Sequence, residues 1–179
     1  MKNEIRKNSK VKSLNFLAID FETANYSRDS ACAVGLVRVE DHKIIDKQSF
    51  LIRPPSSWFI FTDLHGISWN DVKNAPTIAE LWPELKKYFR GIDFITAHNA
   101  SFDNSVLFKF CERYGLKPPD KPFLCTMQIS RSFQGFEYYA LDDVCEYFRI
   151  SLNHHDALSD AIACAKIMIK TLKRGYLET

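Results

Sequence analysis

Four acidic residues and one histidine, spread over three separated segments, are the side chains of this sequence best suited to chemistry. Asp20 and Glu22 lie in the segment LAIDFET, Asp103 lies in HNASFD, and His155 and Asp160 lie in HHDALSDA. Residues two apart on a strand share a face, so the first two acids are expected to project together. If the fold brings all four carboxylates together, they can hold two divalent cations, Mg²⁺ or Mn²⁺, with a proton acceptor beside them.

Electrostatic repulsion separates this metal site from a set of ordinary acids. Two carboxylates about 4 Å apart repel by roughly 4 kcal/mol at an effective dielectric constant near 20. Four of them together would offset a large part of the ~5–15 kcal/mol net stability of a domain. A converged cluster therefore predicts bound cations and metal-assisted phosphodiester hydrolysis. Taken singly, the acids also suit structural roles, as strand-end charges or, for Asp103, as a favourable charge in the first turn of a helix.

Two adjacent histidines precede the last expected helix. Asp156 is a suitable N-cap for that helix, so it needs no role in chemistry. His155 comes directly before this cap, and an imidazole with a pKa near neutrality can take a proton from water. His154 is the alternative candidate for the same role. Asp160 lies on the apolar face of the helix, so its buried carboxylate is expected to have a partner.

The elements that must position these residues form an α/β pattern. Strand-like apolar runs cover residues 15–21, 31–40, 43–52 and 92–96, and a short extended piece covers 122–126. Helical spacing of apolar residues covers 78–89, 102–114, 127–133, 141–148 and 157–173. Residues 53–76 are expected to form a loop. The pattern predicts a mixed five-stranded sheet flanked by helices in a single α/β domain.

Length and charge limit the organisation of the chain. Its 179 residues, 46% of them hydrophobic, can bury one good core. The net charge is +2, but five basic residues against one acidic residue give residues 1–13 a net charge of +4. We therefore expect a basic, flexible tail over 1–13 and a folded domain over 14–175. Affinity for nucleic acid must then come from local patches and bound cations, because the bulk charge is nearly neutral.

The cysteines and the apolar segments indicate the compartment. Five cysteines are widely spaced with no C-x-x-C pair, which is typical of small core residues in a reducing compartment and predicts no zinc site. The N-terminus has no signal-peptide pattern, and no apolar run reaches the length of a membrane span. We expect a cytoplasmic protein that does not enter a membrane.

In this order, DFET, HNASFD and H-x-x-x-x-D resemble the three motifs of the DEDDh 3′–5′ exonuclease superfamily. The resemblance covers residues 14–173. Within the superfamily, the sequence resembles the proofreading epsilon subunit of bacterial DNA polymerase III and its free-standing relatives. The resemblance implies a ribonuclease H-like fold. It also implies that Asp20, Glu22 and Asp160 bind a first metal ion, that Asp20 bridges to a second, that Asp103 acts on the second largely through water, and that His155 is the general base.

The resemblance extends to residues that seat the terminal nucleotide. The family's HGI stretch corresponds to Leu64, His65, Gly66 and Ile67, and Thr23 and Phe102 match positions near that nucleotide. Packing roles remain the alternative for Thr23 and Phe102. Asn99, at the end of the fourth expected strand, is placed on the substrate side of the crevice, where it could bind substrate, support the residues that do, or fix the loop. His98 is expected to be structural or to support the residues of the site.

The resemblance thus implies a 3′–5′ exonuclease that releases nucleoside 5′-monophosphates from single-stranded or frayed ends. DNA is favoured over RNA as the substrate, and a polymerase is a candidate partner. Two alternatives remain: a weakly active or inactive subunit that binds nucleic acid or a polymerase, and an interaction domain whose acids are only caps and surface charges. Oligomeric state is left open by the sequence.

Overall fold

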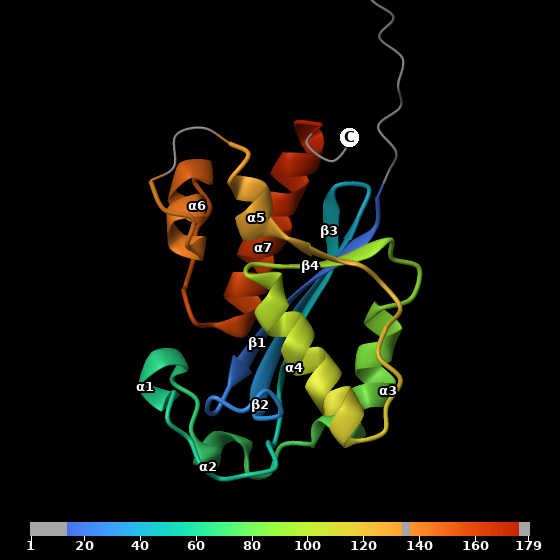
Figure 1. Cartoon of the computed structure of the whole chain (residues 1–179), viewed down its shortest axis with the longest axis vertical. Helices are drawn as coiled ribbons and strands as arrows, with labels where there is room; N and C mark the ends of the chain where they lie inside the picture. Colours follow the sequence, from blue (N-terminus) through green and yellow to red (C-terminus); the bar gives the residue numbers. More distant parts are fainter. Residues whose placement is uncertain (1–13, 134–136, 176–179) are drawn as a thin grey trace, which may run out of the picture.

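Five strands form one mixed sheet in the computed structural model, which describes residues 14–133 and 137–175. Its strand order is β3-β2-β1-β4-β5 (Figure 1). β1 pairs antiparallel with β2 and parallel with β4, and β5 continues the sheet parallel to β4. This confirms the predicted mixed five-stranded sheet. The strands are β1 Phe16–Thr23, β2 Ala31–Glu40, β3 Lys43–Leu51, β4 Phe94–Ala97 and β5 Phe123–Cys125.

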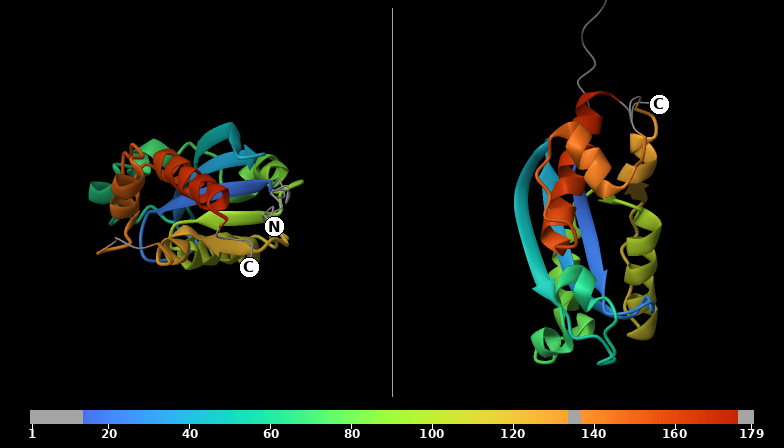
Figure 2. Two further views of the ribbon diagram at one scale, coloured as in Figure 1. Left: turned by 90° about the horizontal axis from the view of Figure 1, so that it is seen from above. Right: turned by 90° about the vertical axis from the view of Figure 1, so that its left-hand side faces the viewer.

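Helices cover both faces of the sheet. In the left view of Figure 2, α7 lies on one side of the strands and α4 lies on the other. The helices are α1 Thr62–His65, α2 Trp69–Val72, α3 Ile78–Tyr88, α4 Ala100–Arg113, α5 Thr126–Ser130, α6 Leu141–Phe148 and α7 Ala157–Lys173. In the described parts of the chain, no helix has both the length and the apolarity that crossing a bilayer requires.

β1 is buried on both faces, and its alternation decides where the acids point. Leu17, Ile19 and Phe21 enter the core that β1 shares with α3 and α4. Phe16 and Ala18 enter the second core, formed with α7. Because side chains alternate along a strand, the even-numbered acids at the end of β1 project toward the α7 side.

Local rules explain several of the connections. Asp41 and His42 join β2 to β3 with φ values of 47° and 59°, as a two-residue hairpin with both central residues left-handed requires. Thr77 caps α3, with its side chain accepting from the Glu80 N–H and the Glu80 carboxylate accepting from the Thr77 N–H. Gly115 has a φ of 61° directly after α4, where a left-handed residue ends a helix.

The structure corrects some expected boundaries. Residues 53–76 were expected to be a loop, but they contain the one-turn helices α1 and α2. β1 continues past the predicted end at residue 21 to Thr23, and α5 ends at Ser130, three residues before the predicted end. The tail predicted over residues 1–13 lies outside the described residues.

Candidate active site

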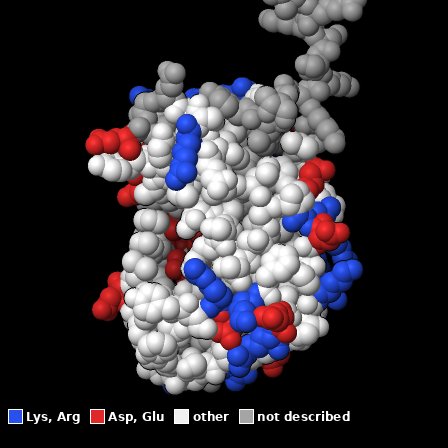
Figure 3. All heavy atoms as spheres, in the orientation of Figure 1, with Lys and Arg blue, Asp and Glu red and all other residues white. Residues whose placement is uncertain are grey.

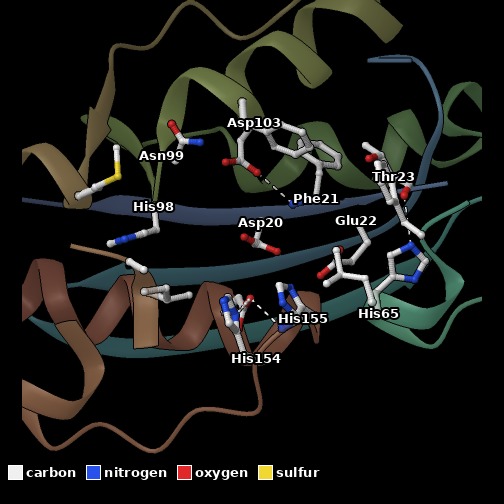
Figure 4. A pocket seen from close by; sticks show the side chains of 17 residues that line it. Asp20, Phe21, Glu22, Thr23, His65, His98, Asn99, Asp103, His154 and His155 are labelled. Carbon is white, nitrogen blue, oxygen red and sulfur yellow. Dashed lines mark hydrogen bonds and ion pairs between the residues drawn. The ribbon is translucent and has the colours of Figure 1, made fainter. Parts of the chain in front are cut away.

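A cleft of about 470 Å³ brings the three motif segments together. It is lined by all five residues that the sequence singled out for chemistry: Asp20, Glu22, Asp103, His155 and Asp160. They come from β1, the first turn of α4, the segment that leads into α7, and the first turn of α7 (Figure 4). Residues that are 140 positions apart in the chain, such as Asp20 and Asp160, thus share one wall.

Three of the carboxylates form a compact group. One oxygen each from Asp20, Glu22 and Asp160 lie within 4.8 Å of one another. Glu22 and Asp160 are 8% and 4% exposed, so water cannot solvate them freely. One oxygen of Asp160, Oδ1, is buried and has no hydrogen-bond partner among the described residues. A buried carboxylate oxygen without a partner, beside two other carboxylates, fits the ligand set of a hard divalent cation.

A glycine on β2 allows α7 to approach β1 closely enough for Asp160 to meet Asp20 and Glu22. Gly35 is the β2 partner of Asp20, and a β-carbon built on it would lie 2.0 Å from the carbonyl oxygen of Ala157. The first turn of α7 can therefore rest directly on the β2 backbone. Asp160, also in the first turn of α7, lies next to Asp20 and Glu22 at the end of β1.

Asp103 reaches the cleft from the opposite side. β1 pairs with β4 only over Phe16–Ala18, so the edge of β1 beyond Ala18 has no strand beside it there. Asp103 Oδ1 fills one of these positions, accepting a hydrogen bond from the Phe21 N–H at 3.0 Å. The Asp103 side chain is 1% exposed. It faces Asp20 across the end of the strand (Figure 4), but it is not part of the group of three that lies within 4.8 Å.

Burial and mutual repulsion make the acids reluctant to ionise. Burial raises the pKa of Glu22 to about 8, and the charges of Asp160 and Asp103 add to this. Burial also raises the pKa of Asp103 to about 8, against the opposing hydrogen bond from Phe21. The pKa of Asp20 is raised well above its usual value, first by burial and then by Asp103, and burial raises the pKa of Asp160. Divalent cations would reverse this balance, because they favour the ionised carboxylates.

The two histidines differ in their contacts. His154 Nδ1 lies 2.9 Å from Asp160 Oδ2, and the backbone N–H of His155 donates to the same oxygen at 3.1 Å. The two rings are stacked, with centroids 3.9 Å apart. His155 has a φ of 66°, and its ring nitrogens have no hydrogen-bond partner among the described residues. Burial, followed by the charge of His154, lowers the pKa of His155, so its ring is largely neutral at neutral pH.

One end of the cleft is formed by β1, α1 and α4. Thr23, Leu64, His65 and Phe102 line it, whereas Asn99 lines the cleft beside His98, toward the other end (Figure 4). These are five of the seven residues that the resemblance assigned to the substrate side. The other two predicted residues do not line the cleft. Gly66 ends α1 with a φ of 76°, and Ile67 packs against the buried cluster of Ala24, Cys32 and Val72.

Gly66 and Ile67 instead help to fix the imidazole of His65. The Ile67 N–H donates to His65 Nδ1 at 3.1 Å, so Nδ1 is the unprotonated nitrogen. Nε2 then carries the proton and can donate to the Thr23 carbonyl oxygen, 3.1 Å away. Burial lowers the pKa of His65, which favours this neutral tautomer.

Asn99 and His98 shape the junction between β4 and α4. Asn99 has left-handed backbone angles, which asparagine tolerates better than most residues, and its side chain accepts from the Ser101 hydroxyl at 3.2 Å. His98 has both ring nitrogens engaged, with the Thr126 hydroxyl and the Tyr139 carbonyl oxygen, each at 2.9 Å. These contacts agree with the structural role expected of His98.

Several residues that line the cleft were not identified from the sequence as site residues: Phe61, Met127, Ala140 and Leu141. Phe61 belongs to the segment WFIF, which follows β3. Met127 lies on α5, and Ala140 and Leu141 lie at the start of α6. Apolar side chains in such segments have the same sequence pattern as core residues, so no signal distinguishes them.

Comparisons with known proteins agree with this geometry. The exonuclease family model named RNase T matches residues 17–168. The PolC-type DNA polymerase III of Caldanaerobacter subterraneus subsp. tengcongensis is 36% identical over 165 residues, which are 89% of this chain and 12% of the relative. The PolC-type enzyme of Bacillus subtilis is 29% identical over 165 residues, 88% of this chain and 11% of the relative. The chain thus spans only a small part of the length of these relatives.

Solved structures show the same fold. Exonuclease X in complex with 5′ overhanging duplex DNA has a TM-score of 0.70 and 25% identity, covering 89% of this chain and 92% of that chain. The nuclease domain of 3′hExo, a DEDDh family member bound to rAMP, has a TM-score of 0.78 and 18% identity, covering 92% and 94%. The expected ribonuclease H-like fold is therefore confirmed. Because the family model spans all three motif segments, the chain belongs to the exonuclease family, and its resemblance to the DEDDh 3′–5′ exonuclease superfamily is confirmed.

Proposed function

We propose that this protein is a 3′–5′ exonuclease that hydrolyses the terminal phosphodiester bond of single-stranded or frayed nucleic acid and releases nucleoside 5′-monophosphates. The observation that carries the proposal is the group formed by Asp20, Glu22 and Asp160, within 4.8 Å of one another. Asp103 and His155 face the same cleft. Family membership over residues 17–168 supports the same activity.

The acids fit a pair of divalent cations, Mg²⁺ or Mn²⁺. Asp20, Glu22 and Asp160 would hold the first, and Asp20 together with Asp103 would serve the second. When bound, the two cations neutralise charge on the phosphate and stabilise the attacking and leaving oxygens of an in-line displacement. Because burial raises the pKa values of Glu22 and Asp103, cation binding would displace protons from these acids.

His155 is proposed as the general base that takes a proton from the attacking water. Its ring lines the cleft, its pKa is lowered by burial, and its nitrogens are free of partners in the described part of the chain. His154 is less suited, because its Nδ1 is already engaged with Asp160. We propose that His154 holds the Asp160 carboxylate in place and supports the stacked ring of His155.

The terminal nucleotide is proposed to lie among Thr23, Leu64, His65 and Phe102. The ring of Phe102 and the apolar side chain of Leu64 offer surfaces for the base and sugar. Gly66 and Ile67 would contribute indirectly. They form the turn in which the Ile67 N–H fixes the ring of His65. Asn99 would act by fixing the start of α4.

DNA is proposed as the preferred substrate, and a replicative polymerase as a candidate partner. Both proposals are supported by the similarity to PolC-type DNA polymerases. Solved relatives include complexes with duplex DNA and with rAMP, so both sugar types must be tested.

The proposal is tested by a time course on 5′-labelled single-stranded DNA and RNA of matched sequence, with Mg²⁺, Mn²⁺ or EDTA. We expect a ladder that shortens from the 3′ end, depends on the cation and is absent in Asp20→Asn. The DNA ladder should advance faster than the RNA ladder. Absence of cleavage in a protein shown to bind both cation and strand would instead indicate a binding subunit.

A further inference from the structure

The loop over residues 24–30, between β1 and β2, is held beside the cleft by several hydrogen bonds. Its ends are joined by the Ala24 N–H, which donates to the Ser30 carbonyl oxygen at 2.9 Å. Inside it, Asn25 and Ser30 are 3% and 2% exposed and bond to each other. The Asn25 amide donates to the Trp58 carbonyl oxygen at 2.8 Å and accepts from the Ser27 N–H at 2.9 Å.

This loop holds the guanidinium group of Arg28 against an aromatic ring of the site. The guanidinium carbon of Arg28 lies 4.3 Å from the ring centroid of Phe102, which lines the cleft. Arg28 itself is exposed and is not among the residues lining the cleft, so it lies at the rim.

Arg28 has no carboxylate partner within ion-pair distance in the part of the chain that the structure describes. The adjacent acid, Asp29, is taken by Arg113 of α4 at 2.7 Å and by the Ser27 hydroxyl at 2.5 Å. The donors of Arg28 are therefore available to a ligand. Guanidinium groups bind phosphate through paired donors and also stack on aromatic rings, and Arg28 is already stacked.

The surroundings indicate which part of the substrate Arg28 can meet. Four acids occupy the floor of the cleft and repel phosphate unless cations are bound. In the space-filling view, acidic atoms lie inside the hollow and basic side chains stand beside it (Figure 3). A strand whose last nucleotide lies in the cleft must leave across the rim, where its next phosphate needs a counter-charge.

We propose that Arg28 binds the phosphate on the 5′ side of the scissile bond and so positions the strand as it leaves the cleft over Phe102. This inference rests on the exonuclease function proposed above. It makes Arg28 a substrate-binding residue that acts on polynucleotides and has no role toward a single nucleotide.

Binding is tested in the slow His155→Ala background, which keeps the proposed cation ligands, with Mg²⁺, using a 5′-fluorescein single-stranded DNA and fluorescence anisotropy at several salt concentrations. Arg28→Ala should raise Kd about tenfold, the loss expected for a charge-assisted hydrogen bond. The slope of log K against log salt should fall by about 0.7, the value for one phosphate on a single strand. Arg28→Lys should keep the slope and recover part of the affinity. Arg90→Ala is the matched control, because Arg90 is also exposed and lies between α3 and β4.

Kinetics on two substrates locate the contact. On the oligonucleotide with Mn²⁺, Arg28→Ala should raise KM about tenfold with kcat nearly unchanged. On the p-nitrophenyl ester of thymidine 5′-monophosphate, which has no second phosphate, kcat/KM should stay within about twofold of the parent protein, since no contact of Arg28 is then lost.

Three outcomes would overturn the proposal. These are equal losses on both substrates, which would place Arg28 at the terminal nucleotide; a weaker affinity with an unchanged salt slope, which would indicate base stacking; and no change at all. The activity of the parent protein distinguishes a failure of the proposed role of Arg28 from a failure of the proposed exonuclease function. If it hydrolyses the oligonucleotide but Arg28→Ala behaves identically, only the role of Arg28 fails. If the parent protein hydrolyses neither substrate, the proposed function itself fails.

Discussion

Gly35 of β2 lies against the carbonyl group of Ala157, so close that a β-carbon on Gly35 would come within 2.0 Å of that oxygen. The same glycine pairs across the sheet with Asp20. A long-range backbone contact with no polar side chain therefore sets the distance between β1 and α7, and with it the meeting of Asp20 with Asp160.

Gly35→Ala should damage both stability and site geometry. The neighbouring atoms are backbone, so α7 or β2 must move, at a cost of about 1–3 kcal/mol for an overpacked core. For a chain of this length that corresponds to a fall in Tm of roughly 2–12 °C. Thermal unfolding measures the first effect, and kcat per folded molecule measures the second.

Gly115→Ala is the matched control for Gly35→Ala. Gly115 has a φ of 61° and nothing within 4 Å of an added β-carbon, so the substitution strains the backbone far from the cleft. It should lower Tm by a comparable amount while leaving kcat of the folded fraction intact. If Gly35→Ala likewise keeps full kcat, the contact with Ala157 does not control the site.

Divalent cations should stabilise the protein by mass action. Binding to the folded state alone adds about 2.7 kcal/mol at a concentration 100 times Kd. We expect Mn²⁺ to raise Tm in the parent protein, and Asp160→Asn to lose most of that rise. In EDTA, Asp160→Asn should unfold at the same temperature or a higher one, because it removes one charge from a repulsive cluster. A parent protein with the same Tm in Mn²⁺ and EDTA would contradict the metal site.

Without cations, stability should fall as pH rises. Glu22 and Asp103 have folded pKa values raised to about 8 from ordinary values of 4.5 and 3.8. The folded state therefore holds more protons than the unfolded state between these limits, and the free energy of unfolding decreases with pH. The loss begins near the unfolded values and is complete above about 8.

The measurement is denaturant unfolding in EDTA at a series of pH values from acid to mildly alkaline. Saturating Mg²⁺ is the control, because bound cations keep the carboxylates ionised and should flatten or reverse the dependence. A free energy of unfolding in EDTA that increases across this range would show that the acids ionise normally and are not clustered.

Local sequence rules account for the elements whose signals lie within a few residues. The Asp41–His42 hairpin, the Thr77 cap and the end of α4 at Gly115 all follow from backbone preferences of the residues concerned. The convergence of Asp20, Asp103 and Asp160 was implied by the resemblance of their three motifs to those of the DEDDh superfamily, whose fold brings the motifs together.

Features that depend on contacts distant in sequence were missed. α1 has Phe61 at its N-cap with no side-chain hydrogen bond, so nothing in its sequence announces a helix. α2 did carry a signal, the Ser68–Asp71 pair, but one turn is too short for apolar periodicity. The packing of Gly35 on Ala157 involves residues 122 positions apart, and no sequence pattern links them.

Alanine substitutions should distinguish the role of His154 from that of His155. His155→Ala removes the proposed base, so kcat should fall by about 10²–10⁴-fold while the Mn²⁺-induced rise in Tm is kept. His154→Ala removes the 2.9 Å contact with Asp160, so its main effect should be a weaker cation affinity. Cation titrations of Tm and of activity, run on both variants, distinguish the two roles.

Saturation with Mn²⁺ decides between the histidines. His154→Ala should recover most of its kcat there, because excess cation compensates for a poorly held ligand, whereas His155→Ala should not. If instead His155→Ala recovers its kcat at saturating Mn²⁺ and His154→Ala does not, the base would be His154. His155 would then be left with its backbone N–H as its contribution to the site, through Asp160.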